Sequence, residues 1–178
     1  MRYILTVMFM TILSCQWQQE VMGQTPNSAK TKKAISSFLD SVEKKQELSS
    51  KLISTYIEID SASYTGYFSN ASFTGDTVFH FFGGFIGAII KYNDGKFCIT
   101  KWMYLFSPEK NENTTSMEIY SDCDRDEDSE YSFLRYKFLN ESSFETIESF
   151  IPANSHKVKS VERHVWKISS NGRFYSVN

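Results

Sequence analysis

The first clear pattern along the chain is helical. Apolar side chains recur at Ile35, Phe38, Leu39 and Val42, a spacing of three and four residues that gathers them on one face of an α-helix. The polar stretch 43–47 interrupts this stripe, so a bend or a second short helix is expected there. We expect the apolar face to pack on a sheet; a helix that binds a partner is the alternative.

Short runs of β-branched and aromatic residues, separated by turn residues, follow the helical segment and predict strands. Gly83-Gly84 lies between two apolar runs and predicts a hairpin with a two-residue loop, because glycine adopts positive φ at both loop positions. Asn93-Asp94-Gly95 predicts the next turn, and Tyr131–Leu139 a further strand. Ser142–Phe150, by contrast, is predicted to form a short helix, which Pro152 would stop.

Asn171-Gly172 predicts one last hairpin. A two-residue loop there pairs Ile168 with Tyr175. Two residues further along each strand, Trp166 then faces Val177. Because side chains two apart in a strand share a face, this register places four large apolar residues on one side of the hairpin.

Successive strands joined by short loops predict a meander, and neighbouring strands of a meander run antiparallel. The expected fold class is therefore α+β: an N-terminal helix packed on a curved, mainly antiparallel β-meander. Cystatin-like folds and small barrels with one added helix share this outline. The sequence contains no internal repeat and no low-complexity block.

The first fifteen residues resemble a bacterial export signal. Arg2 supplies a positive charge, and an apolar run follows at 4–13, too short to span a bilayer. Ile12-Leu13-Ser14-Cys15 then resembles the lipobox of bacterial lipoproteins, in which a small residue precedes a cysteine that is acylated and becomes the mature N-terminus. The resemblance implies a protein of the cell envelope that is held on the membrane through lipid on Cys15. It covers the leader alone.

Two other fates of the leader stay open. Ordinary signal peptidase could cut after Val21-Met22-Gly23, which would discard Cys15 and release a secreted protein, or the leader could remain as an uncleaved anchor. In the preferred division of the chain, residues 1–14 are the signal peptide, and 15–30 are the lipidated N-terminus and a polar, flexible tether. Residues 31–178 then form a single domain.

Two cysteines follow the leader, Cys98 and Cys123, and an exported protein can keep them as a disulfide. If they lie opposite each other in a hairpin, the same register pairs Trp102 with Ile119. It also pairs Tyr104 with Met117 on that face, and it sets Lys101 beside Tyr120 and Met103 beside Glu118 on the other. Two buried free thiols are the alternative.

Composition narrows the functional classes. A formal net charge of −2 gives no basic excess, so a nucleic-acid partner is not expected. The aromatic content of 16% favours a sheet-rich fold. No Gly-rich phosphate loop or nucleophile elbow occurs, so the sequence implies no cofactor and no catalytic residue.

The acidic run Asp122–Glu130 begins like a calcium-binding EF-hand loop. The match then fails, because Glu127 stands where glycine makes the turn and Phe133 stands where the bidentate carboxylate belongs. We therefore expect a solvated acidic hairpin tip and no built metal site; weak calcium binding is the alternative.

The leading functional hypothesis is a non-enzymatic envelope protein that binds a protein partner or a small apolar ligand. A pocket lined by Phe81, Phe85 or Trp102 would favour the ligand. The alternative is an exported hydrolase of unfamiliar type. It requires a cleft in which a histidine meets an acid and a nucleophile, and the chain has three histidines, His80, His156 and His164.

Overall fold

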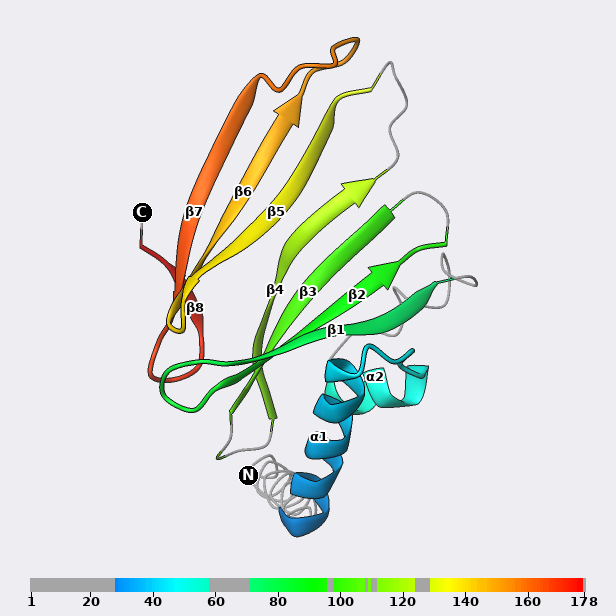
Figure 1. Ribbon diagram of the computed structural model, residues 1–178, viewed down its shortest axis with the longest axis vertical. Coiled ribbons are helices and arrows are strands. Elements are labelled where there is room, and N and C mark those ends of the chain that lie inside the picture. The colour runs from blue at the N-terminus through cyan, green and yellow to red at the C-terminus, as the bar shows by residue number, and fades with distance from the viewer. Residues whose placement is uncertain are drawn as a thin grey trace, which may run out of the picture. The chain divides into compact units, whose positions relative to one another are not determined.

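In the computed structural model, eight strands form one antiparallel sheet in which each strand pairs with its neighbours in sequence (Figure 1). The strands are β1 (Ser72–His80), β2 (Ile86–Asn93), β3 (Cys98–Ser107), β4 (Glu112–Cys123), β5 (Tyr131–Asn140), β6 (Ser143–Ile151), β7 (Ser160–Ile168) and β8 (Phe174–Ser176). The predicted antiparallel meander is confirmed.

The structure describes residues 28–57, 71–95, 98–107, 109, 112–123 and 129–177. The chain divides into two compact units, Met1–Thr31 and Lys32–Asn178. Only residues 28–31 of the first unit are described, and they form the beginning of a helix. The second unit contains the sheet and is considered by itself below. Within the described ranges, no helix has both the length and the apolar character needed to cross a membrane.

Two helices precede the sheet, α1 (Ser28–Glu43) and α2 (Ser50–Tyr56). Lys45, with φ of 54°, lies in the polar stretch that separates them. Ser49 caps α2, since its hydroxyl oxygen accepts a hydrogen bond from the Leu52 amide at 3.3 Å. The linking segment also follows β1: the Leu48 amide donates to the Phe73 carbonyl at 2.8 Å. This segment therefore occupies part of the outer edge of β1.

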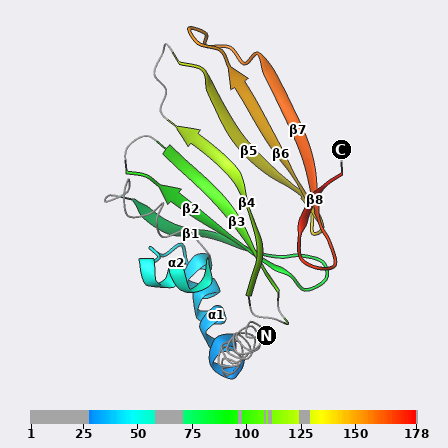
Figure 2. The same cartoon turned by 180° about the vertical axis from the view of Figure 1, so that it is seen from behind.

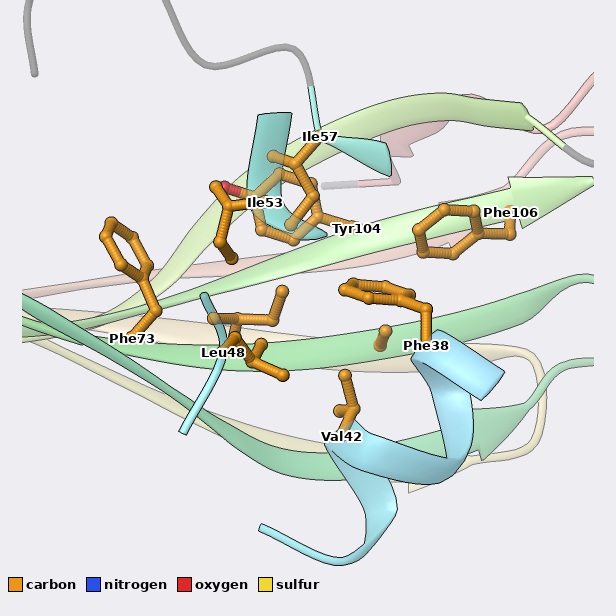
Figure 3. Close-up of a cluster of buried hydrophobic side chains, with 10 residues drawn as sticks. Phe38, Val42, Leu48, Ile53, Ile57, Phe73, Tyr104 and Phe106 are labelled. Atoms are coloured by element: carbon orange, nitrogen blue, oxygen red, sulfur yellow. The ribbon is translucent and has the colours of Figure 1, made fainter. Parts of the chain in front are cut away.

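The helices and one face of the sheet share a core (Figure 3). Phe38 and Val42 from α1 pack with Ile53 from α2 against Tyr104 and Phe106 of β3. A fully buried apolar side chain of this size stabilises the fold by about 1.5–3 kcal/mol relative to an exposed one. This cluster, called the first core, explains the apolar stripe of the helical segment.

The second core lies on the opposite face of β1–β4, where β5–β8 also contribute side chains. Phe79 of β1 and Phe138 of β5 have ring centroids 3.9 Å apart, whereas four strand spacings in a flat sheet would separate these strands by about 19 Å. The sheet must therefore curl so that its first and fifth strands meet. The curl coincides with sparse pairing of β4 with β5, recorded only at Ser121 and Leu134 in the described residues. Figures 1 and 2 accordingly show β1–β4 and β5–β8 as two groups of strands.

The expectation of a helix at Ser142–Phe150 is wrong, because this segment forms β6 and pairs along its length with β5 and β7. Thr146 illustrates the reason. It is buried, and its hydroxyl oxygen accepts a hydrogen bond from the Trp166 indole at 2.9 Å. That partner lies twenty residues away in sequence, so local pattern could not reveal it.

Both glycine-containing hairpins exist, but each loop has three residues instead of two. His80 pairs with Ile86, and the Phe81 amide donates to the Phe85 carbonyl, which leaves residues 82–84 as the loop. In the last hairpin the Ser169 amide donates to the Arg173 carbonyl around residues 170–172. The third loop residue is a glycine in both cases, with φ of 80° at Gly84 and 74° at Gly172. The last hairpin follows the common pattern for three-residue loops, whereas in the β1–β2 loop Gly83 also has a positive φ, of 85°.

The extra loop residue shifts the last hairpin by one position from the expected register. Ile168 pairs with Phe174 instead of Tyr175, and Trp166 pairs with Ser176 instead of Val177. Phe174 therefore joins the second core, while Tyr175 and Val177 are exposed.

Cys98 and Cys123 lie opposite each other in β3 and β4 and form a disulfide. The predicted pairing holds as far as Lys101 and Tyr120, and then a β-bulge shifts it. Trp102 consequently pairs with Glu118, not Ile119, while Met103 faces Met117 and Tyr104 faces Ser116. Ile119 is instead fully buried in the second core. The bulge thus allows Ile119 to reach the second core, and a further register shift follows between Leu105 and Phe106.

Candidate ligand site

The three aromatic residues expected to line a pocket have different positions. Phe81 is 5% exposed within the second core, and Trp102 packs against the first core. Phe85 lines a cavity that lies among the turns.

The cavity has a volume of about 330 Å³, at the small end of the range for ligand pockets. We call it the turn cleft, because its walls come from the β1–β2 loop, the ends of β3 and β4, and the β7–β8 loop. Its lining residues are Gly83, Phe85, Ser107, Glu109, Thr114, Ser170 and Asn171.

Two close contacts hold the walls of the turn cleft together. The Thr114 hydroxyl lies 2.8 Å from the Gly172 carbonyl oxygen and 3.1 Å from that of Leu105, so it can donate to either. Gly172 also approaches Phe85 so closely that an added Cβ would lie 2.6 Å from its ring. A side chain there would push the last hairpin away from Phe85, and this packing is therefore a second reason for glycine in the loop.

A hydrogen-bonded loop positions Asn171 at the cleft. The Ser169 hydroxyl donates to the Asn171 side-chain oxygen, and the Ser169 oxygen accepts from the Arg173 amide at 3.0 Å. Since these bonds order the loop without the Asn171 amino group, its two N–H donors remain chemically available for other acceptors.

Most of the residues that line the turn cleft have polar side chains. The Ser107 and Ser170 hydroxyls are of a kind that both donates and accepts hydrogen bonds, while the Thr114 hydroxyl, whose proton points to a backbone carbonyl, can accept. The Glu109 carboxylate accepts, and the Asn171 amide does both. Phe85 adds an apolar ring. This set of groups suits a ligand that carries several hydroxyls and one apolar surface.

Asp122, the first residue of the acidic run, is committed to internal contacts. Asp122 accepts a hydrogen bond from the Tyr131 hydroxyl at 2.6 Å and forms an ion pair with Arg135 at 2.9 Å. The Tyr131 hydrogen bond and the Arg135 charge hold the pKa of Asp122 below its ordinary value. Arg135 also lies over the Tyr120 ring, 4.5 Å from its centroid. The sequence did not predict this cluster. Its members come from β4 and β5, and the spacing of residues along the chain does not show that these side chains meet.

The remainder of the calcium hypothesis, residues 124–128, lies outside the described residues. Within the described ranges, no three histidine, cysteine or acidic side chains come together in a way that could hold a metal ion.

A second polar cluster borders the second core. The Lys101 ammonium lies 2.7 Å from the Asp76 carboxylate and 5.4 Å from the centroid of the Tyr120 ring. Burial acts to lower the pKa of Lys101, but the hydrogen bond and the charge of Asp76 shift it upward overall. For the neighbouring Tyr136, whose charged form is the anion, burial raises the pKa. Both polar groups of the ion pair are satisfied, which fits a structural role at the rim of the core.

The histidines do not assemble the cleft that a hydrolase requires. His80 ends β1 and is exposed, and His156 is exposed in the β6–β7 turn. His164 lies 3.9 Å from the Glu162 carboxylate and beside the Trp166 ring. None of these contacts brings a hydroxyl or thiol nucleophile to a histidine, so the hydrolase hypothesis gains no support.

The proposed lipidation site, Cys15, lies outside the described residues, as do the leader 1–14 and the tether up to residue 27. Their interpretation still rests on the sequence alone.

The fold and the turn cleft together define a small antiparallel β-sheet domain with a polar cavity among its hairpin ends. Comparison with known proteins does not narrow this class: no protein-family model, no curated protein and no solved structure matches the chain.

Proposed function

We propose that the protein is a non-catalytic binding protein of the bacterial cell envelope that takes a small, hydroxyl-bearing ligand in the turn cleft. The observation that carries the ligand proposal is the lining: five of its seven residues have polar side chains, and they surround one aromatic ring. Sugars present this combination of hydroxyls and an apolar face. The ligand therefore differs in polarity from the apolar one expected from sequence.

The location remains part of the proposal. The lipobox-like Ile12-Leu13-Ser14-Cys15 supports export and acylation at Cys15, and more than one acyl chain would make attachment to the membrane stable. In the alternative, cleavage after Gly23 gives a secreted protein with the same ligand site. We also propose the finer description of the fold, a leading helix on a curved sheet with a cystatin-like outline, because the first core joins α1 to β3.

The intact mass of protein recovered from the membrane fraction tests the anchor. We expect a mature chain that begins at Cys15 and carries acyl mass, and we expect a Cys15→Ser variant to lose that mass. A chain that begins at Gln24 in both proteins would contradict acylation and would favour the secreted form.

Amide chemical shifts test the turn cleft, with glucose and N-acetylglucosamine as hydroxylated probes and benzyl alcohol as an apolar probe. The sugars should shift the amides of Ser107, Thr114 and Asn171 at millimolar concentration, and Glu109→Ala should weaken that binding. Glu109 is exposed, so its replacement leaves the core intact. Ser132→Ala, an exposed change on β5, serves as the control.

Each other outcome of this titration contradicts the proposal in a distinct way. Shifts with benzyl alcohol alone would show an apolar site. Sugar-induced shifts that Glu109→Ala leaves unchanged would place the binding elsewhere, and no shifts with any probe would overturn small-ligand binding in the turn cleft.

A further inference from the structure

The strands β5–β8 have one face in the second core and one face away from it. Phe138, Phe144 and Trp166 stand opposite one another in register and belong to the second core. Because successive side chains of a strand point to opposite faces, their neighbours Lys137, Glu145 and Val165 point away from that core. The same alternation places Arg163 and Lys167 on the outer side.

We call this outer surface the basic face and define it by six residues, which belong to β5, β7, β8 and the residue that follows β8. They are Lys137, Val161, Arg163, Lys167, Tyr175 and Val177. Lys137 and Lys167 are exposed, and the Arg163 side chain is 58% exposed while it contacts Glu145 at 3.3 Å.

Large apolar side chains lie among these cations. Val161, Tyr175 and Val177 are 48%, 45% and 42% exposed. They are half of the exposed large hydrophobic residues found in the described part of the chain. Exposed apolar side chains that gather in one place, with charged residues around them, are typical of an interaction surface.

Charge along the chain is divided unevenly in the same region. Residues 152–178 contain five Lys or Arg and one acidic residue, a net charge of +4, whereas residues 1–151 contain fourteen against twenty, a net charge of −6. The net charge of −2 for the whole chain therefore conceals a basic C-terminal part.

We propose that the basic face lies against an anionic phospholipid surface. Two properties favour this occupant: the cations complement lipid phosphates, and the valines and tyrosine among them are the kind of side chains that enter the region between headgroups and acyl chains. An open sheet face also presents these groups side by side over an area, whereas a pocket would enclose a single charged group. The inference builds on the proposed membrane location, which would keep this face near its lipid, but its chemistry does not depend on acylation.

Sedimentation with vesicles tests the basic face, using the full chain with Cys15→Ser so that no acyl chain contributes. We expect tighter binding to vesicles that contain phosphatidylglycerol than to phosphatidylcholine alone, and loss of the difference at high salt. The double substitution Lys137→Gln with Lys167→Gln should weaken binding about fivefold for each lysine removed. The matched control is Lys44→Gln with Lys51→Gln, which removes one exposed cation that directly follows α1 and one within α2 and should leave the affinity unchanged.

Three outcomes would overturn the proposal. Equal binding to both kinds of vesicle would show that lipid charge is not recognised, and an equal loss in the control pair would show a general charge effect. Binding to soluble polyglutamate but not to vesicles would identify an acidic macromolecule as the partner. The mass of the wild-type protein reports acylation separately, so failure of the anchor is distinguishable from failure of the basic face.

Discussion

At the scale of single residues, two glycines in neighbouring strands show how differently a close contact can constrain a position. A Cβ on Gly75 would lie 2.3 Å from the Cα of Val42, which is backbone of α1. A Cβ on Gly87 would lie 2.6 Å from the outer edge of the Phe81 ring. A ring can rotate or shift, whereas the helix backbone moves only if the first core is repacked.

We therefore expect Gly75→Ala to lower the free energy of unfolding by more than the roughly 1–3 kcal/mol typical of overpacking. Gly87→Ala is the matched control, and its cost should be smaller. Urea denaturation of both variants measures the difference. Equal losses in the free energy of unfolding would mean that the α1 backbone shifts as easily as the Phe81 ring.

Asp122 provides a prediction in terms of pH. Its folded-state pKa is held below the ordinary value of an aspartate, with the Tyr131 hydrogen bond as the largest cause. A depressed pKa means that the carboxylate stabilises the fold above pH 4 or so, and that this contribution is lost as the pH falls through the folded-state pKa. Tyr131→Phe should raise the pKa of Asp122 toward its ordinary value.

Carboxyl NMR titration measures this shift directly. The stability difference between Tyr131→Phe and the wild type should be present at neutral pH and should shrink in acid, because protonated Asp122 no longer benefits from the charged contacts. Tyr175→Phe, at an exposed tyrosine of β8, should leave the Asp122 titration unchanged. An unaltered Asp122 pKa in Tyr131→Phe would contradict the assigned cause.

At the scale of elements, the β3–β4 hairpin is tied at one end by the Cys98–Cys123 disulfide, which spans 25 residues in sequence. Such a link stabilises a domain by about 2–4 kcal/mol, chiefly by restricting the unfolded chain. The double substitution Cys98→Ser with Cys123→Ser should lower the free energy of unfolding by that amount. Reductant should destabilise the wild type to the same extent and leave the double variant unaffected; any response of the double variant would point to another origin.

The elements that the sequence predicted well are those with a local cause. The helical stripe at Ile35–Val42 and the positions of the glycine turns, although not their loop lengths, depend on residues a few positions apart. The cysteine pair aligned the start of β3 with the end of β4. The bulge at Ile119 and the strand at β6 depend on distant partners. In β6 the buried polar residues Thr146 and Ser149 obscured the alternation expected of a strand.

The turn cleft was even less predictable. Phe85 was the one lining residue that the sequence offered, and it was chosen because it is aromatic. The polar lining residues come from three separate stretches of the chain, and the cleft exists only because the sheet curls until its hairpin ends meet. No spacing rule connects Ser107 with Asn171.

At the scale of the whole second unit, the second core joins both halves of the sheet. Phe144 of β6 is fully buried there, together with Ile89 of β2 and Leu105 of β3. Removing its ring should therefore weaken the packing of both groups of strands, even though β6 pairs with neither β2 nor β3.

We expect Phe144→Ala to cost about 3–5 kcal/mol and to leave unfolding cooperative. With fluorotryptophan, ¹⁹F NMR can follow Trp102 in β3 and Trp166 in β7 separately during urea denaturation. Both resonances should change at the same, lowered midpoint. A shift of the Trp166 transition alone would mean that the two halves of the sheet unfold independently.

The meander has a consequence for the order of assembly. Because each strand pairs with the strand that precedes it, a chain that emerges N-terminus first from a ribosome or a translocation channel can add strands one at a time, and loops between partners stay short. The first core and the disulfide need no residue after Cys123. Only the curl that brings Phe79 against Phe138 must wait for later strands. Closure of the second core, and with it the turn cleft, is accordingly the last step that the topology permits.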